Sequence, residues 1–319
     1  MKKFFKNKNI LVAGGSGFLG TNFLTKLSKY NCNIKATYLN NRKFLRIKKI
    51  KYIKADLLNK KHCNKVCSNV DILIIASAVS SGAADIQNRP LIHLTPNLII
   101  NSLLLETAYK NKVKHVVFIS SSTVYPLSKK IMTENSDNYN FFEKYFIVGW
   151  MKKFSEIICE MYATKIKDTM KCTIIRPSNI YGPHDKFDLG KAKVIPALIN
   201  KIFRSKHKIE VWGDGKDIKD FIYVEDFIDA TLKIITKQNK IFDIFNISQG
   251  NSITLNKVIM CLKKITNKKN LIIKYNKTKP TMIPIRKISS KKINKMWKPK
   301  HSLLSGLTKT YDWYSKQNS

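Results

Sequence analysis

The chain has 319 residues, with 59 lysines and arginines against 21 aspartates and glutamates, so its formal net charge is +38. A content of 44% hydrophobic residues is ordinary for a globular protein and excludes a disordered chain. No segment approaches the roughly 20 apolar residues that a membrane-spanning helix needs, and the apolar run behind the basic start is too short for a secretory signal. We therefore expect a cytoplasmic protein with one large domain or two lobes.

The positive charge is spread along the whole chain and comes almost entirely from lysine. A surface that recognises nucleic acid would be richer in arginine, because arginine forms paired hydrogen bonds with bases and phosphates. The composition therefore favours a solvated lysine surface over a nucleic-acid site. Such a surface still attracts anionic ligands, including nucleotides.

The cysteines do not form a Cys-x-x-Cys pair, although Cys63 and Cys67 lie four residues apart on a predicted helix. A second pair of cysteines or histidines that could complete a metal site is absent from the sequence around them, and so is a His-Glu-x-x-His motif. We expect reduced structural thiols and no metal.

The first half of the chain alternates short apolar runs with amphipathic helical patterns. Strands are predicted over residues 8–13, 33–39, 52–55, 70–76, 113–120 and 170–175. Helices are predicted over residues 18–29, 96–110 and 146–164. This alternation is typical of a parallel, doubly wound sheet with right-handed crossovers. Residues 1–176 are therefore predicted to form an α/β domain of the Rossmann type.

The pattern becomes more irregular after residue 176. Helices are predicted over residues 194–203 and 224–236, and a strand over 209–212 with a glycine turn behind it. Residues 253–319 are predicted to give a helix, a strand and a terminal helix near 302–314. We expect a smaller α+β lobe that binds the substrate over residues 177–319, interwoven with the first domain because no linker separates them.

Three glycines, Gly14, Gly17 and Gly20, follow the first predicted strand and open the first predicted helix. In a dinucleotide site the first glycine permits a tight turn, the second lets the backbone approach a pyrophosphate, and the third lets the helix pack close to the sheet. The diphosphate would lie at the positive end of the helix, against free N–H groups. A strand before the glycines and a helix after them is the context that this site requires.

The glycine spacing, Gly-x-x-Gly-x-x-Gly, resembles that of the extended short-chain dehydrogenase/reductase family, which includes the NAD-dependent epimerases and dehydratases. Further matching segments are Asp56-Leu57, Ala76-Ser-Ala78, Arg176-Pro-Ser-Asn-Ile-Tyr-Gly-Pro183 and the stretch from Gly213-Asp-Gly215 to Asp220-Phe-Ile-Tyr-Val-Glu-Asp226. The resemblance runs over nearly the whole chain. It implies an enzyme with an NAD(P) cofactor.

The resemblance implies cofactor contacts at the ends of several strands, namely Gly14, Ser16, Gly17, Phe18, Leu19, Gly20, Arg42, Asp56, Leu57, Ala76, Ser77, Ala78, Lys152, Pro177 and Asn179. An acidic residue at the end of the second strand would select NAD by binding the free ribose hydroxyl. Leu39-Asn-Asn-Arg42 holds no acid and one arginine, which favours NADP. Asn40 leaves NAD open, and Arg42 could instead be a surface residue.

The family's catalytic set is a serine or threonine, a tyrosine and a lysine. Ser121 is expected to bind the reacting oxygen, and Lys152 matches the lysine because Glu156 follows it at the expected spacing. The tyrosine position, however, holds Val148. Tyr145 lies seven residues before Lys152 and could share its helix face. We expect Tyr145 to act either as a substitute acid–base group or as a packing or substrate contact.

The segments Asn179-Ile-Tyr-Gly-Pro-His-Asp-Lys-Phe-Asp188 and Ala192-Lys-Val-Ile-Pro-Ala-Leu198 resemble the GDP-L-fucose synthase-like nucleotide-sugar enzymes. Thr123 stands where that subgroup has a reactive cysteine, and Lys193 where it has a histidine that acts as general acid. Hydride transfer depends largely on proximity and orientation, whereas epimerisation needs both a base and an acid at carbon. We therefore expect oxidation or reduction at C4 of a GDP-linked sugar in surface-polysaccharide synthesis.

The resemblance implies substrate contacts at Ser122, Asn179, Lys193, Val194, Trp212, Lys219 and Arg286. Two alternatives stay open: a nucleotide-sugar epimerase or combined epimerase/reductase, and a non-catalytic protein that binds nucleotides or RNA. The helices predicted over 96–110 and 146–164 correspond to those that form a four-helix dimer interface in similar proteins. We therefore expect a homodimer without membrane attachment.

Overall fold

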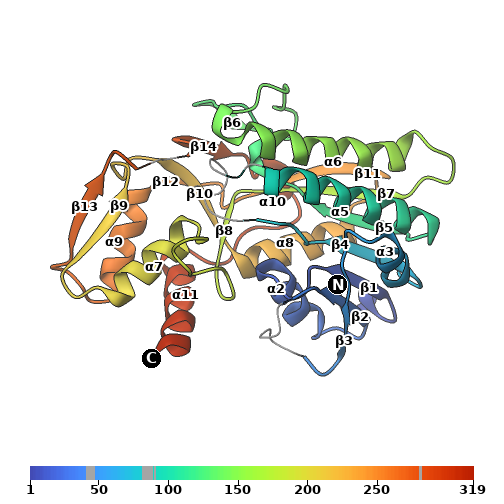
Figure 1. Ribbon diagram of the computed structural model, residues 1–319, viewed down its shortest axis with the longest axis horizontal. Helices are drawn as coiled ribbons and strands as arrows, with labels where there is room; N and C mark the ends of the chain where they lie inside the picture. The colour runs from blue at the N-terminus through green and yellow to red at the C-terminus, as the bar shows by residue number, and fades with distance from the viewer. Residues whose placement is uncertain (41–46, 81–88, 90, 280–281) are drawn as a thin grey trace.

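The computed structural model describes residues 1–40, 47–80, 89, 91–279 and 282–319 (Figure 1). Its larger sheet is formed by β1 (Asn9–Ala13), β2 (Asn33–Tyr38), β3 (Ile50–Lys54), β4 (Ile72–Ile75), β5 (His115–Ile119), β7 (Lys171–Pro177) and β11 (Phe242–Ile247). The strand order is β11-β7-β5-β4-β1-β2-β3, and every pairing is parallel. The predicted doubly wound sheet is therefore confirmed, and the strand order reverses between β1 and β4.

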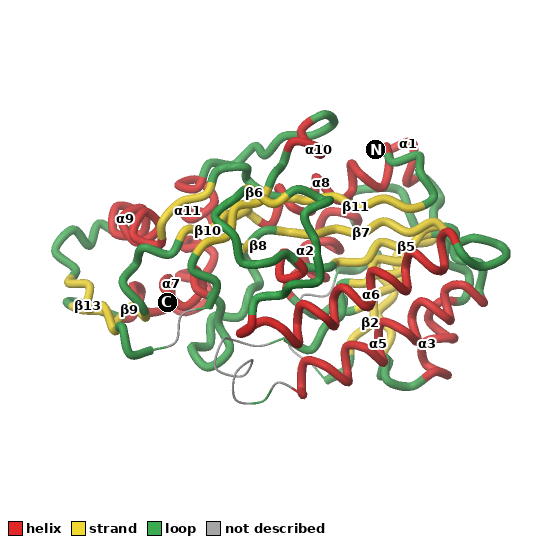
Figure 2. The backbone as a smooth tube through the Cα atoms, turned by 90° about the horizontal axis from the view of Figure 1, so that it is seen from above, coloured by secondary structure: helices red, strands yellow, loops and turns green. Residues whose placement is uncertain are grey.

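Helices cover both faces of this sheet (Figures 1 and 2). One face carries α2 (Phe18–Leu27) and α8 (Val224–Lys237), and the other carries α3 (Lys60–Cys67), α5 (Leu91–Lys110) and α6 (Phe146–Thr164). The short α1 (Lys2–Phe5) precedes β1. Within β1, Ile10 and Val12 belong to the first core cluster, whereas Leu11 and Ala13 belong to the second. Since both faces are covered, the central strands are apolar on both sides.

A smaller α+β lobe lies beside the larger sheet. Its sheet has the order β12 (Ser252–Thr254), β10 (Ile218–Tyr223), β14 (Ile285–Ile288), β6 (Ile131–Met132), with β8 (Asn179–Tyr181) also paired to β10. A second ribbon pairs β9 (Lys208–Trp212) with β13 (Ile272–Asn276). The helices of this lobe are α7 (Val194–Arg204), α9 (Leu255–Ile265) and α11 (Leu303–Asn318), whereas the short α10 (Lys291–Asn294) contacts β11 of the larger sheet.

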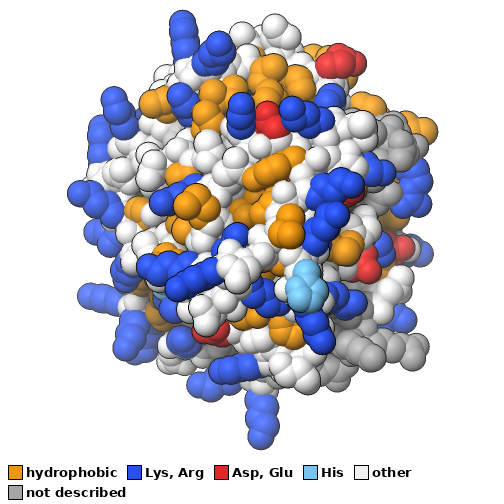
Figure 3. Space-filling model, turned by 90° about the vertical axis from the view of Figure 1, so that its left-hand side faces the viewer, with side chains coloured by type: hydrophobic (Ala, Val, Ile, Leu, Met, Phe, Trp, Pro, Cys, Tyr) orange, Lys and Arg blue, Asp and Glu red, His pale blue; other side chains and the backbone are white. Residues whose placement is uncertain are grey.

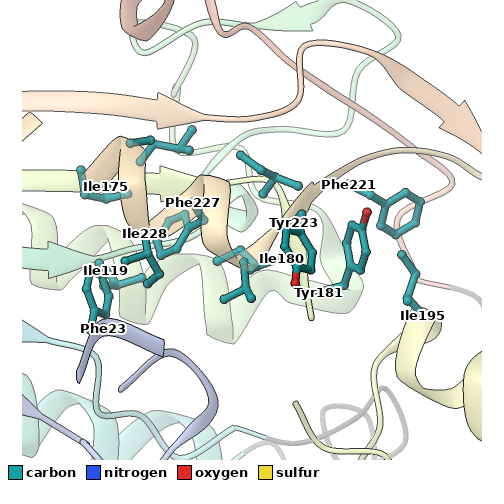
Figure 4. Packing of buried hydrophobic residues seen from close by; sticks show 14 of the residues in the cluster. Phe23, Ile119, Ile175, Ile180, Tyr181, Ile195, Phe221, Tyr223, Phe227 and Ile228 are labelled. Atoms are coloured by element: carbon teal, nitrogen blue, oxygen red, sulfur yellow. The ribbon is translucent and has the colours of Figure 1, made fainter. Parts of the chain in front are cut away.

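The chain crosses between the two sheets more than once. β6 precedes residue 176 but lies in the smaller sheet, and β11 follows it but completes the larger one. The division at residue 176 into two interwoven lobes stays a prediction. Figure 4 shows one apolar cluster that extends from Phe23 and Ile119 through Phe227 and Tyr223 to Ile195. Because this cluster is continuous, residues of both lobes pack together in it.

Most predicted elements agree with the structure, but several were missed or misplaced. The helix expected to start at residue 96 begins at Leu91, so Pro96 lies inside α5. The strands β6, β8, β10, β11, β12 and β14 and the short helix α10 were not predicted. These strands are two to six residues long, and β10 has the buried Asp220 at its centre, which hides its apolar pattern.

The surface is basic without a single concentrated stripe on the face shown in Figure 3, where lysine and arginine side chains are spread among apolar and neutral ones. In the part of the chain that the structure describes, no helix has the length and apolar character needed to cross a bilayer.

Candidate active site

The glycine turn between β1 and α2 has the tight geometry that was predicted. Gly14 has a φ of +82°, and a Cβ on it would lie 2.6 Å from the Cα of Ser77. A Cβ on Gly20 would lie 2.1 Å from the carbonyl oxygen of Gly14. Internal packing therefore requires both glycines. A Cβ on Gly17 would meet only the Gly14 oxygen, at 3.3 Å, and Gly17 caps α2 without a side-chain hydrogen bond.

The loop behind β4 adjoins the glycine turn. Ala76 donates its backbone N–H to the carbonyl of Ala13 over 3.1 Å. The hydroxyl of Ser77 is buried and has no hydrogen-bond partner within the described residues. Val79 is fixed by Asn97 of α5, whose side chain accepts from its N–H at 2.8 Å and donates to its carbonyl at 3.0 Å. At the switch point of the sheet, the hydroxyl of Ser77 thus lies near the glycine turn that precedes α2 and is unpaired among the described residues.

These features fit a bound dinucleotide. The first N–H groups of α2 and the buried hydroxyl of Ser77 would bind phosphate oxygens, and Gly17 leaves space for a close approach of the phosphate. The predicted contacts Ser16, Phe18 and Leu19 lie in the same turn and in the first residues of α2, and Ala78 follows Ser77. Arg42 lies outside the described residues.

The remaining predicted cofactor contacts lie at other strand ends. Asp56 follows β3, and its side chain accepts a hydrogen bond from the backbone N–H of Leu58 over 3.0 Å, while Leu57 is buried. Pro177 is the last residue of β7. Asn179 lies in β8 and donates from its side chain to the carbonyl of Asp220 over 2.9 Å.

Lys152 brings an amine from α6 to the carboxyl end of β5. Its Nζ donates to the carbonyl of Ile119 over 2.8 Å and lies 4.8 Å from the centroid of the Phe118 ring. Burial lowers the pKa of Lys152 to about 8, opposed by the charge of Glu156 and assisted by that of Lys193. The amine can therefore gain or lose a proton near neutral pH.

The predicted hydroxyl residues closely follow Ile119, whose carbonyl binds this amine. Ser121 follows Ile119 by two positions, and its Oγ accepts from the backbone N–H of Thr123 over 3.2 Å. The hydroxyl of Thr123 is buried and without a partner among the described residues. A Cβ on Gly149 would lie 2.9 Å from the Thr123 carbonyl oxygen, so α6 starts in close contact with this loop. Val148 is half-buried beside Gly149.

Tyr145 immediately precedes α6. Burial raises its pKa to about 12, opposed by the positive charge of Arg286. Arg286 of β14 is itself buried, and its guanidinium donates to the carbonyls of Pro126 at 2.7 Å and Tyr125 at 3.1 Å. The structure therefore brings Tyr145 to an arginine that fixes the loop behind Ser121.

A network of buried charged side chains joins α6 to the larger sheet. Arg176 of β7 donates to both carboxylate oxygens of Glu156, at 2.9 and 2.5 Å, and to Asp137 at 3.1 Å. Ser120 donates to Glu156 at 2.5 Å, and Lys153 pairs with Asp137. The network joins α6 to the ends of β5 and β7 and so fixes the helix turn that carries Lys152. The sequence reasoning missed Asp137, because no local pattern marks it.

The predicted substrate contacts are spread over several helices and strands. Ser122 lies in the short helix η1 (Ser122–Val124), Asn179 in β8, and Lys193 and Val194 at the start of α7. The others, Trp212, Lys219 and Arg286, lie in the strands β9, β10 and β14. The amine of Lys219 is bound to Asp217 at 2.7 Å and to the carbonyl of Ile283 at 3.0 Å. Lys219 is thus paired within the protein.

Asp185 is one of two carboxylates in the run between β8 and α7, and it received no role from the sequence. It has a buried carboxylate oxygen without a hydrogen-bond partner among the described residues. The position of this acid in a matched segment was the available signal, but the nearby Asp188 carries the same signal.

Comparisons with known proteins identify the family and the fold of the chain. The model of the NAD dependent epimerase/dehydratase family matches residues 10–248. The GDP-L-fucose synthase of Sinorhizobium fredii is 27% identical over 317 residues, which cover 96% of this chain and 95% of the relative. The GDP-L-colitose synthase of Yersinia pseudotuberculosis is also 27% identical, with 97% and 99% covered. The UDP-glucose 4-epimerase of Thermotoga maritima superposes with a TM-score of 0.86 at 24% identity, covering 98% of this chain and 100% of that one.

Proposed function

The chain belongs to the NAD-dependent epimerase/dehydratase family, and on this premise we propose that it is an NAD(P)-dependent oxidoreductase acting at C4 of a GDP-linked sugar in surface-polysaccharide synthesis. Two relatives that match nearly the whole chain are named as synthases of GDP-linked sugars. The observation that carries the proposal is the position of the Lys152 amine at the Ile119 carbonyl, two residues before Ser121. The amine of Lys152 and the hydroxyl group of Ser121 are thus both held at the carboxyl end of β5.

The protein's own groups bind and orient the reactants. A bound nicotinamide coenzyme supplies or accepts the hydride. The hydroxyl of Ser121 donates a hydrogen bond to the reacting sugar oxygen, and the charged form of Lys152 stabilises negative charge that develops there. Since the pKa of Lys152 lies at about 8, its amine can also hold the proton that this oxygen gains or loses. No tyrosine is needed for this arrangement, although its absence is expected to slow the reaction.

The test uses purified protein with GDP-4-keto sugars and NADPH. Oxidation of the coenzyme, followed by absorbance, should occur with wild type and fall at least about 100-fold in S121A and K152M. The control is S128A, because Ser128 is half-buried in the loop that follows η1 and its Oγ accepts a hydrogen bond from the backbone N–H of Lys130. Unchanged absorbance with every nucleotide sugar tried contradicts the proposed activity.

We further infer that NADP is the preferred coenzyme. The support is the sequence behind β2, where Leu39 and Asn40 are exposed and no carboxylate is present to bind a free ribose hydroxyl. Fluorescence titration with NADPH and NADH measures the preference. Tighter binding of NADH would reject it.

A combined epimerase/reductase is the second candidate. Lys193 favours the combined epimerase/reductase. Its charge acts on Lys152, so a second lysine amine lies in the same region as the first. Incubation in deuterated water separates the two reactions. Deuterium at C3 or C5 of the product indicates epimerisation, whereas simple C4 chemistry leaves both positions unlabelled.

We also propose a homodimer that is formed through α5 and α6, which lie side by side (Figures 1 and 2). Large apolar side chains follow one another at helical spacing on the outer side of α6, and each is more than a third exposed: Phe146, Trp150, Phe154 and Met161. Ile99 of α5 adds to this surface. An exposed apolar face of this kind is typical of a protein interface. Sedimentation should give a dimer for wild type and a monomer for F154E.

The thiols support a cytoplasmic enzyme. All six cysteines are free, and Cys63, Cys67, Cys159 and Cys172 are buried. Free thiols are the ordinary state in a reducing compartment, and we infer that the enzyme works in the cytoplasm.

A further inference from the structure

The segment between β8 and α7 crosses the switch point of the larger sheet. Asn22 of α2 donates from its side chain to the carbonyl of Pro183 over 3.0 Å. Lys186 donates from its amine to the carbonyl of Ser80 over 2.6 Å, in the loop behind β4. The segment is therefore attached to both sides of the site at which a dinucleotide is expected. Asp185 lies between these two attachments.

The carboxylate of Asp185 is only partly satisfied by the protein. Its Oδ1 accepts from the backbone N–H of Lys186 over 2.8 Å, whereas Oδ2 is buried and has no hydrogen-bond partner in the described part of the chain. Burial raises the pKa of Asp185 above its ordinary value, although the charges of Lys193 and Lys186 oppose the rise. A buried acceptor without a donor destabilises a protein. The free protein thus retains an unfavourable group at this position.

The neighbours of Asp185 connect it with the catalytic end of β5. Lys193 is the N-cap residue of α7, and its charge acts both on Asp185 and on Lys152. The surroundings therefore include two cations, but no described residue donates a hydrogen bond to Oδ2. A ligand hydroxyl is a donor that fits, because it satisfies a buried carboxylate oxygen without adding charge.

We propose that Asp185 is a ligand-binding residue, whose Oδ2 accepts a hydrogen bond from a hydroxyl of a bound sugar ring. The ring is either the hexose of the nucleotide sugar or a ribose of the coenzyme, since both carry hydroxyl groups and both belong at this end of the sheet. The inference rests on the proposed function, which supplies both ligands.

The test measures binding by calorimetry with three probes: GDP, GDP-mannose and NADPH. D185A should weaken binding of GDP-mannose or NADPH by about tenfold or more, because a hydrogen bond to a charged group is lost, and should leave GDP unchanged. D185N keeps an acceptor oxygen and should lose less. The matched control is D188N, since Asp188 is exposed in the same segment and its Oδ1 accepts from the backbone N–H of Gly190. This variant should bind all three probes as wild type does.

The stability of the free protein gives a second readout. D185N should unfold at the same temperature as wild type or at a higher one, because it removes a charge that is shared with Oδ2, which is buried without a hydrogen-bond donor among the described residues. The probe whose binding is weakened, GDP-mannose or NADPH, should raise the unfolding temperature of D185N by less than it raises that of wild type. Unchanged affinity of D185A for both GDP-mannose and NADPH overturns the inference, and so does a free D185N that is less stable than wild type.

The probes also separate this inference from the proposed function. A wild type that binds NADPH but neither GDP nor GDP-mannose contradicts the GDP-sugar proposal, while the NADPH arm still decides the role of Asp185. Loss confined to GDP-mannose assigns the hydroxyl to the hexose. Loss confined to NADPH assigns it to the coenzyme ribose.

Discussion

The amine of Lys152 donates a hydrogen bond to the carbonyl oxygen of Ile119, 2.8 Å away, and thereby joins α6 to the carboxyl end of β5. Ser121 follows two residues later on the same strand end. A lysine amine is thus held at the carboxyl end of β5, in an environment that lowers its pKa to about 8. The predictions below test the consequences of this contact and of the groups that support it.

The first prediction concerns stability and pH. The pKa of Lys152 falls from 10.5 to about 8 on folding, so between these values the unfolded chain keeps a proton that the folded protein has lost. The stability of wild type relative to K152M should therefore rise from pH 8 to pH 10.5 and stay constant below pH 8. Urea unfolding of both proteins across this range measures the difference. A difference that is constant with pH would show that Lys152 titrates as an ordinary lysine.

The second prediction restores a missing hydroxyl. Val148 lies one helical turn before Lys152, on the same face of α6. V148Y should place a phenol beside the amine and raise kcat, by about tenfold to 100-fold, because general acid–base catalysis contributes about 10²–10⁴-fold when it is well positioned. V148F is the control for side-chain size and should not raise kcat. Equal rates for V148Y and V148F would contradict the assigned geometry.

The third prediction tests the network of buried charged side chains that joins α6 to the larger sheet. Glu156 accepts from Arg176 and Ser120, and its side chain is only 2% exposed. E156Q should lower the free energy of unfolding by about 3–5 kcal/mol, since it leaves the buried Arg176 without its main counter-charge. Glu160 is exposed one turn later, so E160Q should change stability by less than about 0.5 kcal/mol. Equal losses in chemical denaturation would show that the network is not responsible.

The fourth prediction separates two glycines of one turn. In G20A the new Cβ would meet the Gly14 oxygen at 2.1 Å, so the turn must distort and stability should fall by about 1–3 kcal/mol or more. In G17A the nearest contact is 3.3 Å, so the protein should keep its fold and lose affinity for the coenzyme by about tenfold. Thermal unfolding and NADPH titration measure the two effects. Wild-type affinity in G17A would show that no phosphate approaches this residue.

Much of the larger domain was predictable from the sequence, because its signals are local. The strand β1, the glycines and the amphipathic α2 follow one another directly, and α6 has the bounds predicted from its apolar spacing. The strands of the smaller lobe were harder to predict, since they are short and are stabilised by pairing with distant segments. β10 is an example, because its buried Asp220 accepts from the backbone N–H groups of Gln249 and Gly250.

Candidate site residues could be chosen from the sequence where neighbouring residues match a motif, as for Ser121 and Lys152, and their roles stay predictions. The partners of those residues were not, because they come from distant positions. Asp137 reaches Arg176 across 39 residues, and Arg286 reaches the loop behind Ser121 across about 160. The sequence indicated a ligand contact for Arg286 and could not reveal that its guanidinium binds backbone carbonyls.

The central claim is that this chain moves a hydride between a nicotinamide coenzyme and C4 of a GDP-linked sugar. NADPH that carries deuterium at the transferable position, incubated with the protein and a GDP-4-keto sugar, tests it most directly. The account predicts a GDP-sugar product with one deuterium at C4, found by NMR and mass spectrometry. A product labelled at another carbon, or a sugar that stays unlabelled while the coenzyme remains reduced, would contradict it.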